Sequence, residues 1–259
     1  MQESVGITKA VDDPTRARRG GWCFDKTGSQ ADPVYGEPDL LGIYNRLTKG
    51  GKYVGRATLP LLVDTKTNTI VCNESKDIVR QLRAMSTTRD LAPPNKVAEI
   101  EAVSSDIYRV NNGVYKCGFS SKQGAYDYAV TDVFDCLDDI NAILEKQRFL
   151  TGNTLSEADV FLLPTITRFD AIYHPFFRAS KTSISLSYPA IMRWLSDMCA
   201  IPNVRDQFDL HDAKRSYYKQ LFPLNPSALI PATMEQPYLE ILANTKEDPA
   251  YASTVFDNK

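Results

Sequence analysis

The residues with the clearest chemical use are Asn73, Glu74 and Ser75, which stand directly before an amphipathic segment. Apolar residues recur at helical spacing between positions 78 and 85, so the three polar residues are predicted to open a helix. Polar side chains at a helix entry exchange hydrogen bonds with its free backbone N–H groups. Those N–H groups and the helix dipole favour negative charge, so this stretch suits a small anionic ligand.

A hairpin with an unusual proline leads into that helix. The short apolar runs 59–63 and 70–72 are predicted to be strands, and the polar residues 64–69 between them predict a turn. Pro60 removes a hydrogen-bond donor, so it belongs at a strand edge, at a bulge or in a cis turn. Two interpretations stay open. Pro60 is either an ordinary strand-edge residue, or a cis-proline that exposes the preceding backbone to a ligand, as in the thioredoxin-like half of glutathione transferases.

Composition narrows the possible classes of protein. The 259 residues are 43% apolar and 24% charged, which is typical of a globular protein with one large or two modest domains. The formal net charge of −2 gives no electrostatic case for binding nucleic acid or a membrane. Five cysteines without metal-ligand spacing, and only two histidines, predict neither a disulfide framework nor a metal site. We therefore expect a cytoplasmic protein in a reducing compartment.

The first part of the chain is predicted to be α/β. Residues 4–11 alternate well enough for a strand, and residues 12–21 form a charged loop that ends in glycine. Trp22 follows in a short aromatic segment, where a tryptophan packs locally more often than it contacts a ligand. Residues 38–47 are predicted to form a short amphipathic helix before the hairpin.

The adjacent Pro93 and Pro94 mark a linker, and the chain beyond them is predicted to be almost entirely helical. Apolar stripes predict helices over residues 96–112, 123–146 and 188–199. Ser156, with Asp159 three residues later, is an N-terminal capping signature for a further apolar helix. We expect a bundle of about five helices, followed by an extended tail after residue 225.

Motifs in this helical part resemble one family. Thr151-Gly-Asn-Thr-Leu-Ser-Glu-Ala-Asp-Val160 resembles the buried N-capping box of the glutathione transferase C-terminal domain, which makes Asp159 structural. The other motifs recur in order as Asn111-Asn-Gly-Val-Tyr-Lys-Cys-Gly-Phe119, Arg168-Phe-Asp-Ala-Ile-Tyr173, Lys214-Arg-Ser-Tyr-Tyr218, Asn225-Pro226 and Ile230-Pro231. Together they resemble the glutathionyl-hydroquinone reductases, the Xi class of glutathione transferases, from about residue 5 to residue 231.

This resemblance implies the glutathione transferase fold in two domains. A thioredoxin-like α/β domain would occupy residues 1–86 and an all-helical bundle residues 95–231, with a tail over residues 232–259. The resemblance also implies a homodimer, glutathione as the co-substrate, and an aromatic or quinol small molecule as the substrate.

The resemblance further implies a glutathione site in the first domain. The matching residues are Trp22, Arg56, Leu59, Pro60, Glu74 and Ser75. In the family the tryptophan lies against glutathione, the backbone before the cis-proline meets its cysteinyl part, and the Glu-Ser pair binds its γ-glutamyl group. Glutathione has two carboxylates and an ammonium, so an arginine, a glutamate and a helix N-terminus provide complementary charge.

Three tyrosines would serve the electrophilic substrate. Tyr115 corresponds to the family's proton donor, while Tyr173 and Tyr217 correspond to tyrosines that line the quinone pocket. Phenolic O–H groups can stabilise a thiolate or a substrate oxyanion. Tyr218 is the neighbouring alternative to Tyr217. The simpler interpretation is that all of them are half-buried core residues in a chain with 13 tyrosines.

The sequence departs from the family at the nucleophile. The family uses the cysteine of a Cys-Pro-Trp motif at a helix N-terminus, which lowers the pKa of the thiol, and this sequence contains no such motif. The chain is expected to begin at the family's second strand, so the first strand–helix unit is missing and the α/β domain is incomplete. Three explanations stay open: a truncated fragment, a remnant that binds without reductase chemistry, or a recruited cysteine.

Cys23, directly after Trp22, is the candidate for such recruitment. The other four cysteines, Cys72, Cys117, Cys136 and Cys199, are predicted to be core residues. Two functions therefore remain. The first is the glutathione-dependent reduction of glutathionyl-hydroquinones, and the second is a non-catalytic glutathione-binding or scaffold module.

Overall fold

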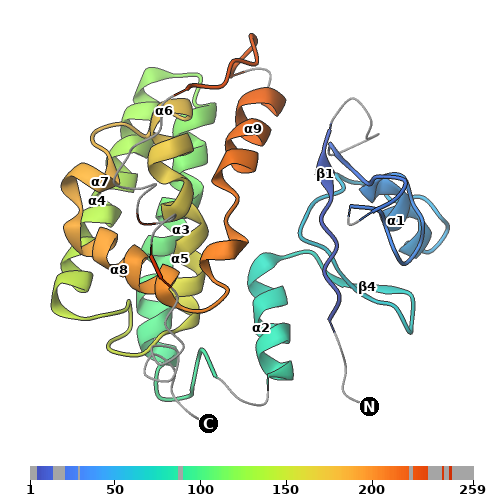
Figure 1. The fold of residues 1–259 in the computed structure, drawn as a ribbon, viewed down its shortest axis with the longest axis horizontal. Helices are drawn as coiled ribbons and strands as arrows, with labels where there is room; N and C mark the ends of the chain where they lie inside the picture. Colours follow the sequence, from blue (N-terminus) through green and yellow to red (C-terminus); the bar gives the residue numbers. More distant parts are fainter. Residues whose placement is uncertain are drawn as a thin grey trace. The chain divides into compact units, whose positions relative to one another are not determined.

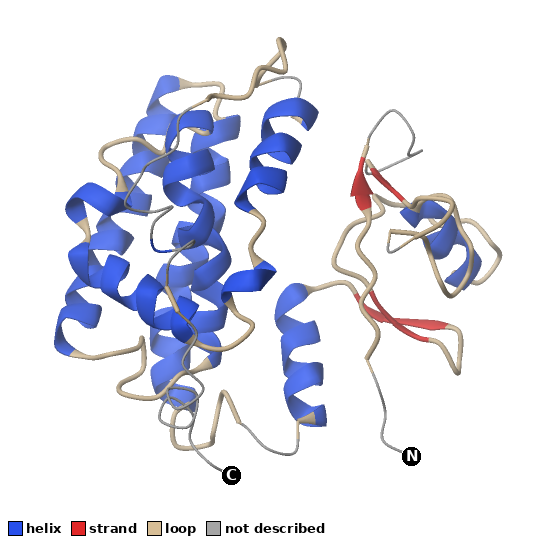
Figure 2. Cartoon of the chain, in the orientation of Figure 1, coloured by secondary structure: helices blue, strands red, loops and turns tan. Residues whose placement is uncertain are grey.

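The computed structural model describes residues 5–13, 21–28, 30–86, 90–221, 224–232, 241 and 245–246. The chain divides into two compact units, an N-terminal unit Met1–Met85 and a C-terminal unit Ser86–Lys259. Figure 1 follows the elements along the chain, and Figure 2 shows short strands in the first unit and helices in the second. Within the described ranges, no helix is long and apolar enough to cross a membrane.

The N-terminal unit is a small α/β structure. Its elements are β1 Val11–Asp12, β2 Trp22–Cys23, α1 Leu40–Leu47, β3 Leu62–Asp64, β4 Thr69–Cys72 and α2 Ser75–Met85. Strands β1 and β2 form one antiparallel pair, and β3 and β4 form another. Its core is made by the buried residues Phe24, Leu40, Leu41, Ile43, Tyr44 and Ala57. Among the described residues, this core is much smaller than the core of the C-terminal unit.

The predicted strand over residues 4–11 is wrong for most of its length. Only Val11 lies in a strand, where it pairs with Cys23, and residues 5–10 are irregular. A strand needs partners for its N–H and C=O groups, and no described strand pairs with residues 5–10. Ile7 is 89% exposed, so the alternation buries no apolar face. The predicted loop 12–21 is partly corrected, because Asp12 belongs to β1, and its residues 14–20 lie outside the described part.

The predicted hairpin is confirmed by β3 and β4, although β3 begins only at Leu62. The peptide bond between Leu59 and Pro60 is cis, so the cis-turn interpretation of this proline is the correct one. The two predicted helices of this unit are also present. Helix α1 begins after Asp39, whose side chain accepts a hydrogen bond from the backbone N–H of Gly42 at 2.8 Å.

The C-terminal unit is helical throughout its described elements. These are α3 Val97–Phe119, α4 Gln123–Lys146, α5 Glu157–Arg168, a π-helix η1 Phe169–Tyr173, α6 His174–Phe176, α7 Ile184–Ser187, α8 Pro189–Ala200, a 3-10 helix η2 Arg205–Gln207 and α9 Leu210–Gln220. Helices α3 and α4 lie along one another, with α5 against α3 and α8 against α4 (Figure 1). Gly113 on α3 permits the close contact, because a Cβ there would collide with the side chain of Val133 on α4.

The predicted helices agree with these elements to different degrees. Helix α4 has the predicted bounds, and α8 differs by one residue at each end from a helix over 188–199. Helix α3 continues beyond the predicted residue 112 to Phe119, because Val114 and Cys117 extend its buried face. The segment 224–232 contains no helix, as expected for the start of the tail.

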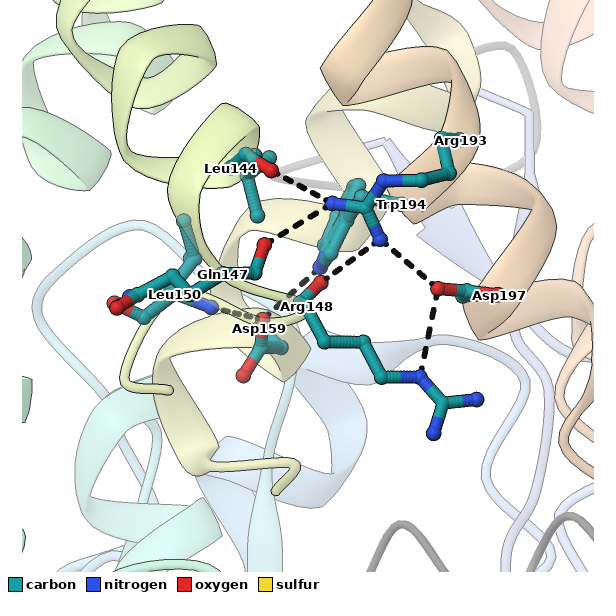
Figure 3. Close-up of polar contacts among 8 residues, drawn as sticks. All are labelled: Leu144, Gln147, Arg148, Leu150, Asp159, Arg193, Trp194 and Asp197. Atoms are coloured by element: carbon teal, nitrogen blue, oxygen red, sulfur yellow. Dashed lines mark hydrogen bonds and ion pairs between the residues drawn. The ribbon is translucent and has the colours of Figure 1, made fainter. Parts of the chain in front are cut away.

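Asp159 holds the start of α5 against the rest of the bundle (Figure 3). It forms the predicted capping box with Ser156, and its fully buried carboxylate accepts four hydrogen bonds. Two come from Ser156, one from the backbone N–H of Leu150 at 2.9 Å, and one from Nε1 of Trp194 at 2.9 Å. Burial raises the pKa of this carboxyl group, and the four donors oppose that rise.

Arg193 on α8 caps the C-terminal end of α4 (Figure 3). Its guanidinium donates to the carbonyl oxygens of Leu144 at 2.7 Å, Gln147 at 3.0 Å and Arg148 at 3.3 Å. It also pairs with the carboxylate of Asp197 at 3.0 Å. The last carbonyls of a helix lack partners within the helix and carry partial negative charge, so a cation there is stabilising.

Candidate functional site

Three tyrosines from distant parts of the chain meet in the C-terminal unit; we call Tyr115, Tyr173 and Tyr217 the tyrosine cluster. The hydroxyl of Tyr217 lies between the other two, hydrogen-bonded to the hydroxyl of Tyr115 and, at 3.0 Å, to that of Tyr173. The ring centroids of Tyr115 and Tyr173 are 5.7 Å apart. Three phenolic groups thus share one hydrogen-bonded chain.

Each tyrosine of the cluster is placed by a different element. Tyr115 lies on α3, Tyr173 ends the π-helix, and Tyr217 lies on α9. Asp170 fixes the π-helix, because its buried carboxylate accepts hydrogen bonds from the backbone N–H groups of Ile184 at 2.7 Å and of the following residue at 2.9 Å. This explains why the Arg168–Tyr173 motif contains an aspartate as well as a tyrosine.

Phe177 is a fourth aromatic residue of this region, and sequence reasoning missed it. It is fully buried, its ring stacks on that of Tyr173 at 5.6 Å, and its centroid is 5.1 Å from that of Tyr115. Gly118 leaves room for this ring, because a Cβ at that position would collide with it. Gly118, inside the Asn111–Phe119 motif, was the signal in the sequence that a bulky side chain packs at this position.

The tyrosines differ in their access to solvent. Tyr115 is 39% exposed and Tyr173 is 2% exposed, while Tyr217 is partly buried. Burial, and secondarily the negative charge that Tyr115 would carry if ionised, raises the pKa of Tyr173. Burial and the two neighbouring phenols raise the pKa of Tyr217. Tyr173 and Tyr217 therefore remain protonated at physiological pH and can act as hydrogen-bond donors.

Tyr218, the alternative to Tyr217, faces elsewhere. Its ring packs on Phe176 at 4.5 Å, it is buried, and its hydroxyl has no hydrogen-bond partner among the described residues. Burial raises its pKa to about 12. The structure thus brings Tyr217, and not Tyr218, to Tyr115 and Tyr173.

The residues predicted to bind glutathione lie in the N-terminal unit. Arg56 is exposed on the segment that leads to the cis peptide bond of Leu59 and Pro60. Glu74 is exposed directly before α2, and Ser75 is the first residue of that helix. An exposed helix start with a serine and a carboxylate leaves backbone N–H groups available to an anionic group.

Trp22 is less exposed to solvent than the other residues that are predicted to bind glutathione. It lies on β2, where it pairs with Asp12, and its partly buried side chain packs against the core of the N-terminal unit. Packing of this kind is the plainer role that its sequence context favoured.

In this structure Cys23 is too deeply buried to act as a nucleophile. Its side chain is 1% exposed, and its thiol lies 3.5 Å from the carbonyl oxygen of Val11, to which it donates. None of the five cysteines forms a disulfide in the described part of the chain, and burial raises the pKa of Cys117, Cys136 and Cys199 to about 11. Cys72 on β4 is the least buried of the five. A catalytic thiol needs access and a lowered pKa, and none of the four buried thiols has the first.

Comparison with known proteins assigns the superfamily first. The profile of the "Glutathione S-transferase, C-terminal domain" matches residues 101–197, which lie within the C-terminal unit. Glutathionyl-hydroquinone reductase YqjG of Escherichia coli (strain K12) is 36% identical over 218 residues, which cover 81% of this chain and 66% of that protein. Glutathionyl-hydroquinone reductase PcpF of Sphingobium chlorophenolicum is 35% identical over 224 residues, with 84% and 71% covered.

Solved structures agree with these relatives. The Xi glutathione-S-transferase of Phanerochaete chrysosporium has a TM-score of 0.77 at 33% identity, covering 86% of this chain and 74% of its own. The glutathione-bound structure of YqjG from Escherichia coli K-12 has a TM-score of 0.80 at 33% identity, with 89% and 76% covered. The chain belongs to the glutathionyl-hydroquinone reductase family, the Xi class of glutathione transferases.

Membership of this family confirms the predicted fold class, a thioredoxin-like α/β part followed by a helical bundle. The chain spans about two thirds of the length of the curated relatives above, 66% and 71%. Within the parts of the chain that the structure describes, no group of three His, Cys, Asp or Glu side chains could hold a metal ion.

Proposed function

We propose that this chain binds glutathione through its N-terminal unit and acts on glutathionyl-hydroquinones, or similar aromatic glutathione conjugates, through the tyrosine cluster. The observation that carries the proposal is the meeting of the Tyr115, Tyr173 and Tyr217 hydroxyls, two of which are 102 residues apart in sequence. A site for a hydroxylated aromatic ring needs a few polar donors that converge among apolar groups, and the three hydroxyls provide them.

Glutathione fits the charges of the N-terminal unit. The carboxylate of Glu74 would pair with the γ-glutamyl ammonium, and Ser75 with the first N–H groups of α2 would bind the α-carboxylate beside it. Arg56 would pair with the second carboxylate of the tripeptide. The backbone of Leu59 would meet the cysteinyl part, as the cis peptide bond in the matching family motif implies.

The tyrosine cluster would act on the aromatic part of the conjugate. In the family's reaction a thiolate attacks the thioether sulfur, the bond from sulfur to the ring carbon breaks, and the ring carbon gains a proton as a disulfide forms. Charge then develops on the ring oxygens, where the protonated Tyr173 and Tyr217 would donate hydrogen bonds. Tyr115 is the member of the cluster with most access to solvent, which suits a residue that gives up a proton and regains it.

The second candidate function is binding without turnover, and the cysteines favour it. The sequence has no Cys-Pro-Trp, and four of its five cysteines are buried. A chain of this sequence would then bind glutathione or its conjugates as a module or scaffold. For either function we further propose a homodimer in the cytosol, as the family resemblance implies. Sedimentation velocity would measure the stoichiometry.

Isothermal titration with glutathione tests the N-terminal half of the proposal. We expect binding by the wild-type chain and its loss in Glu74→Ala, because the ammonium of glutathione loses its partner. Asp77→Ala is the matched control, since Asp77 is an exposed carboxylate in the first turn of the same helix. We expect its affinity to stay within about twofold. Equal binding by wild type and Glu74→Ala would place the site elsewhere.

Turnover of glutathionyl-menadione tests the tyrosine cluster and separates the two candidate functions. If the chain has activity, Tyr217→Phe should lower kcat about 10- to 100-fold, because one hydroxyl supports both neighbouring phenols. Tyr218→Phe should leave kcat unchanged, because its hydroxyl lies outside the cluster. Glutathione binding without any turnover would favour the binding module. An equal loss in both variants would contradict the role of the cluster.

A further inference from the structure

One buried tyrosine of the N-terminal unit joins the two segments that carry the predicted glutathione residues. Tyr44 lies on α1 and is 1% exposed. Its hydroxyl donates to the backbone carbonyl of Thr58 at 2.9 Å and accepts from Nδ2 of Asn73 at 3.1 Å. The same amide nitrogen lies 3.3 Å from Oγ1 of Thr58. Tyr44, Asn73 and both the backbone carbonyl and the side chain of Thr58 are thus joined by three hydrogen bonds.

These hydrogen bonds lie directly beside the residues that are predicted to bind glutathione. Thr58 directly precedes Leu59 and the cis-proline, and Asn73 directly precedes Glu74 and Ser75. The ladder between β3 and β4 ends at the pair of Leu62 and Cys72. Beyond that pair the two segments are no longer joined by strand pairing, and the bonds through Tyr44 and Asn73 link them instead.

The hydroxyl of Tyr44 is itself held firmly. Its ring belongs to the core of the N-terminal unit and packs on the ring of Tyr53, with centroids 4.6 Å apart. A phenol has one proton to give, and here the proton goes to the carbonyl of Thr58 while a lone pair takes the amide of Asn73. A buried core residue therefore links the segment before the cis peptide bond to the segment before α2.

We propose that Tyr44 is a positioning residue for glutathione, acting through Thr58 and Asn73. This rests on the glutathione binding proposed above. The cysteinyl and γ-glutamyl parts of glutathione are covalently joined, so their two subsites must be held at one fixed separation. Tyr44 fixes that separation from the core of the N-terminal unit, while the residues that would contact the ligand lie on the surface. No contact between Tyr44 and glutathione is required.

Removing the hydroxyl alone tests this role. Tyr44→Phe keeps the buried ring and should weaken glutathione binding about tenfold in a titration, because the two subsites lose their common link. Tyr53→Phe is the matched control, since it removes a hydroxyl from the neighbouring ring that makes none of these bonds. Its affinity should stay within about twofold. Thr58→Val removes only the longest of the three bonds and should have an effect between the two.

Hydrogen exchange of the unliganded protein separates positioning from general destabilisation. Tyr44→Phe should speed amide exchange in residues 56–60 and 73–77, and leave α1 itself unchanged. Should Tyr44→Phe fail to fold, Asn73→Ala replaces it, because Asn73 is exposed and its loss leaves the core intact. We expect Asn73→Ala to weaken binding about threefold or more.

The outcomes distinguish two failures. A wild-type chain that does not bind glutathione overturns the proposed function, and the positioning role with it. A wild-type chain that binds glutathione, together with equal affinity in Tyr44→Phe and Asn73→Ala, overturns the positioning role alone. Faster exchange throughout the N-terminal unit, with affinity lost in proportion to the unfolded fraction, would also overturn it.

Discussion

The tyrosine cluster lies on long helices and a buried π-turn of the C-terminal unit, whereas the predicted glutathione residues lie on loops and at one helix start of the N-terminal unit. The helices of the first group pack around one large core. The second group is supported by the six buried residues of a small core. The tyrosines are therefore held by packing in a large core together with the hydrogen bonds of Asp170, while the predicted glutathione residues depend more on individual hydrogen bonds.

The buried polar groups show the same contrast. In the C-terminal unit, Asp159 and Asp170 are buried carboxylates with two backbone donors each, and Arg193 binds three carbonyls at a helix end. In the N-terminal unit, Asp39 caps one helix and Tyr44 links two loops. Aromatic side chains can thus be brought together inside a bundle, while the residues predicted to bind a charged peptide lie at the surface and need separate supports.

Of the variants that test this contrast between the two units, Asp159→Ala should lower the free energy of unfolding the most. It would remove the acceptor of four donor groups in the bundle, so the free energy of unfolding should fall by about 3–5 kcal/mol. The two tryptophans of the sequence lie one in each unit, so urea unfolding of a Trp22→Phe background, followed through Trp194, reports on the C-terminal unit. Asp139→Ala, an exposed carboxylate on α4, is the control and should change stability by less than about 0.5 kcal/mol.

A smaller effect is expected at Arg193. Arg193→Met keeps much of the apolar stem but removes the cap on α4, so the free energy of unfolding should fall by about 1–2 kcal/mol. Arg80→Met on α2 is the control from the N-terminal unit, because Arg80 makes an exposed ion pair with Asp77 at 3.6 Å. We expect about 0.5 kcal/mol or less for that change. Equal effects in the two variants would contradict the contrast between the units.

Thiol labelling gives the smallest and most local test. In the native protein at pH 8, iodoacetamide should modify Cys72 more than about tenfold faster than the other four cysteines, because burial shields them and raises the pKa of three of them to about 11. Peptide mass spectrometry after short exposure would give the order. Labelling of Cys23 first would show an opening that the structure does not contain, and would restore it as a candidate nucleophile.

Local sequence patterns predicted the parts of the fold that depend on neighbours along the chain. The stripe over residues 123–146 gave α4 its correct bounds, and Ser156 with Asp159 marked the start of α5. The strand predicted over residues 4–11 was wrong, because alternation along a segment does not reveal whether a partner strand exists. The end of α3 was placed too early, because the buried face continues through Cys117 in the absence of any local stop.

The candidate site could be predicted only where a motif contained it. The motifs gave Tyr115, Tyr173 and Tyr217, and the structure brings them together, while their catalytic roles stay a prediction. Phe177 and Tyr44 were missed, because their partners Tyr115 and Asn73 lie far away in the sequence. Contacts of that kind arise from tertiary packing, which no local pattern in a single sequence reports.

The π-helix Phe169–Tyr173 has a consequence for how this site can change. Its backbone N–H of His174 bonds to the carbonyl of Phe169, five residues back instead of four, so the turn contains one extra residue. Each residue of a regular α-helix advances the direction of the side chains by about 100°. Loss of one residue from this turn would therefore rotate Tyr173 away from its two partners and present a different residue. A single-codon deletion in this turn would thus change which side chain joins Tyr115 and Tyr217, with every other residue kept.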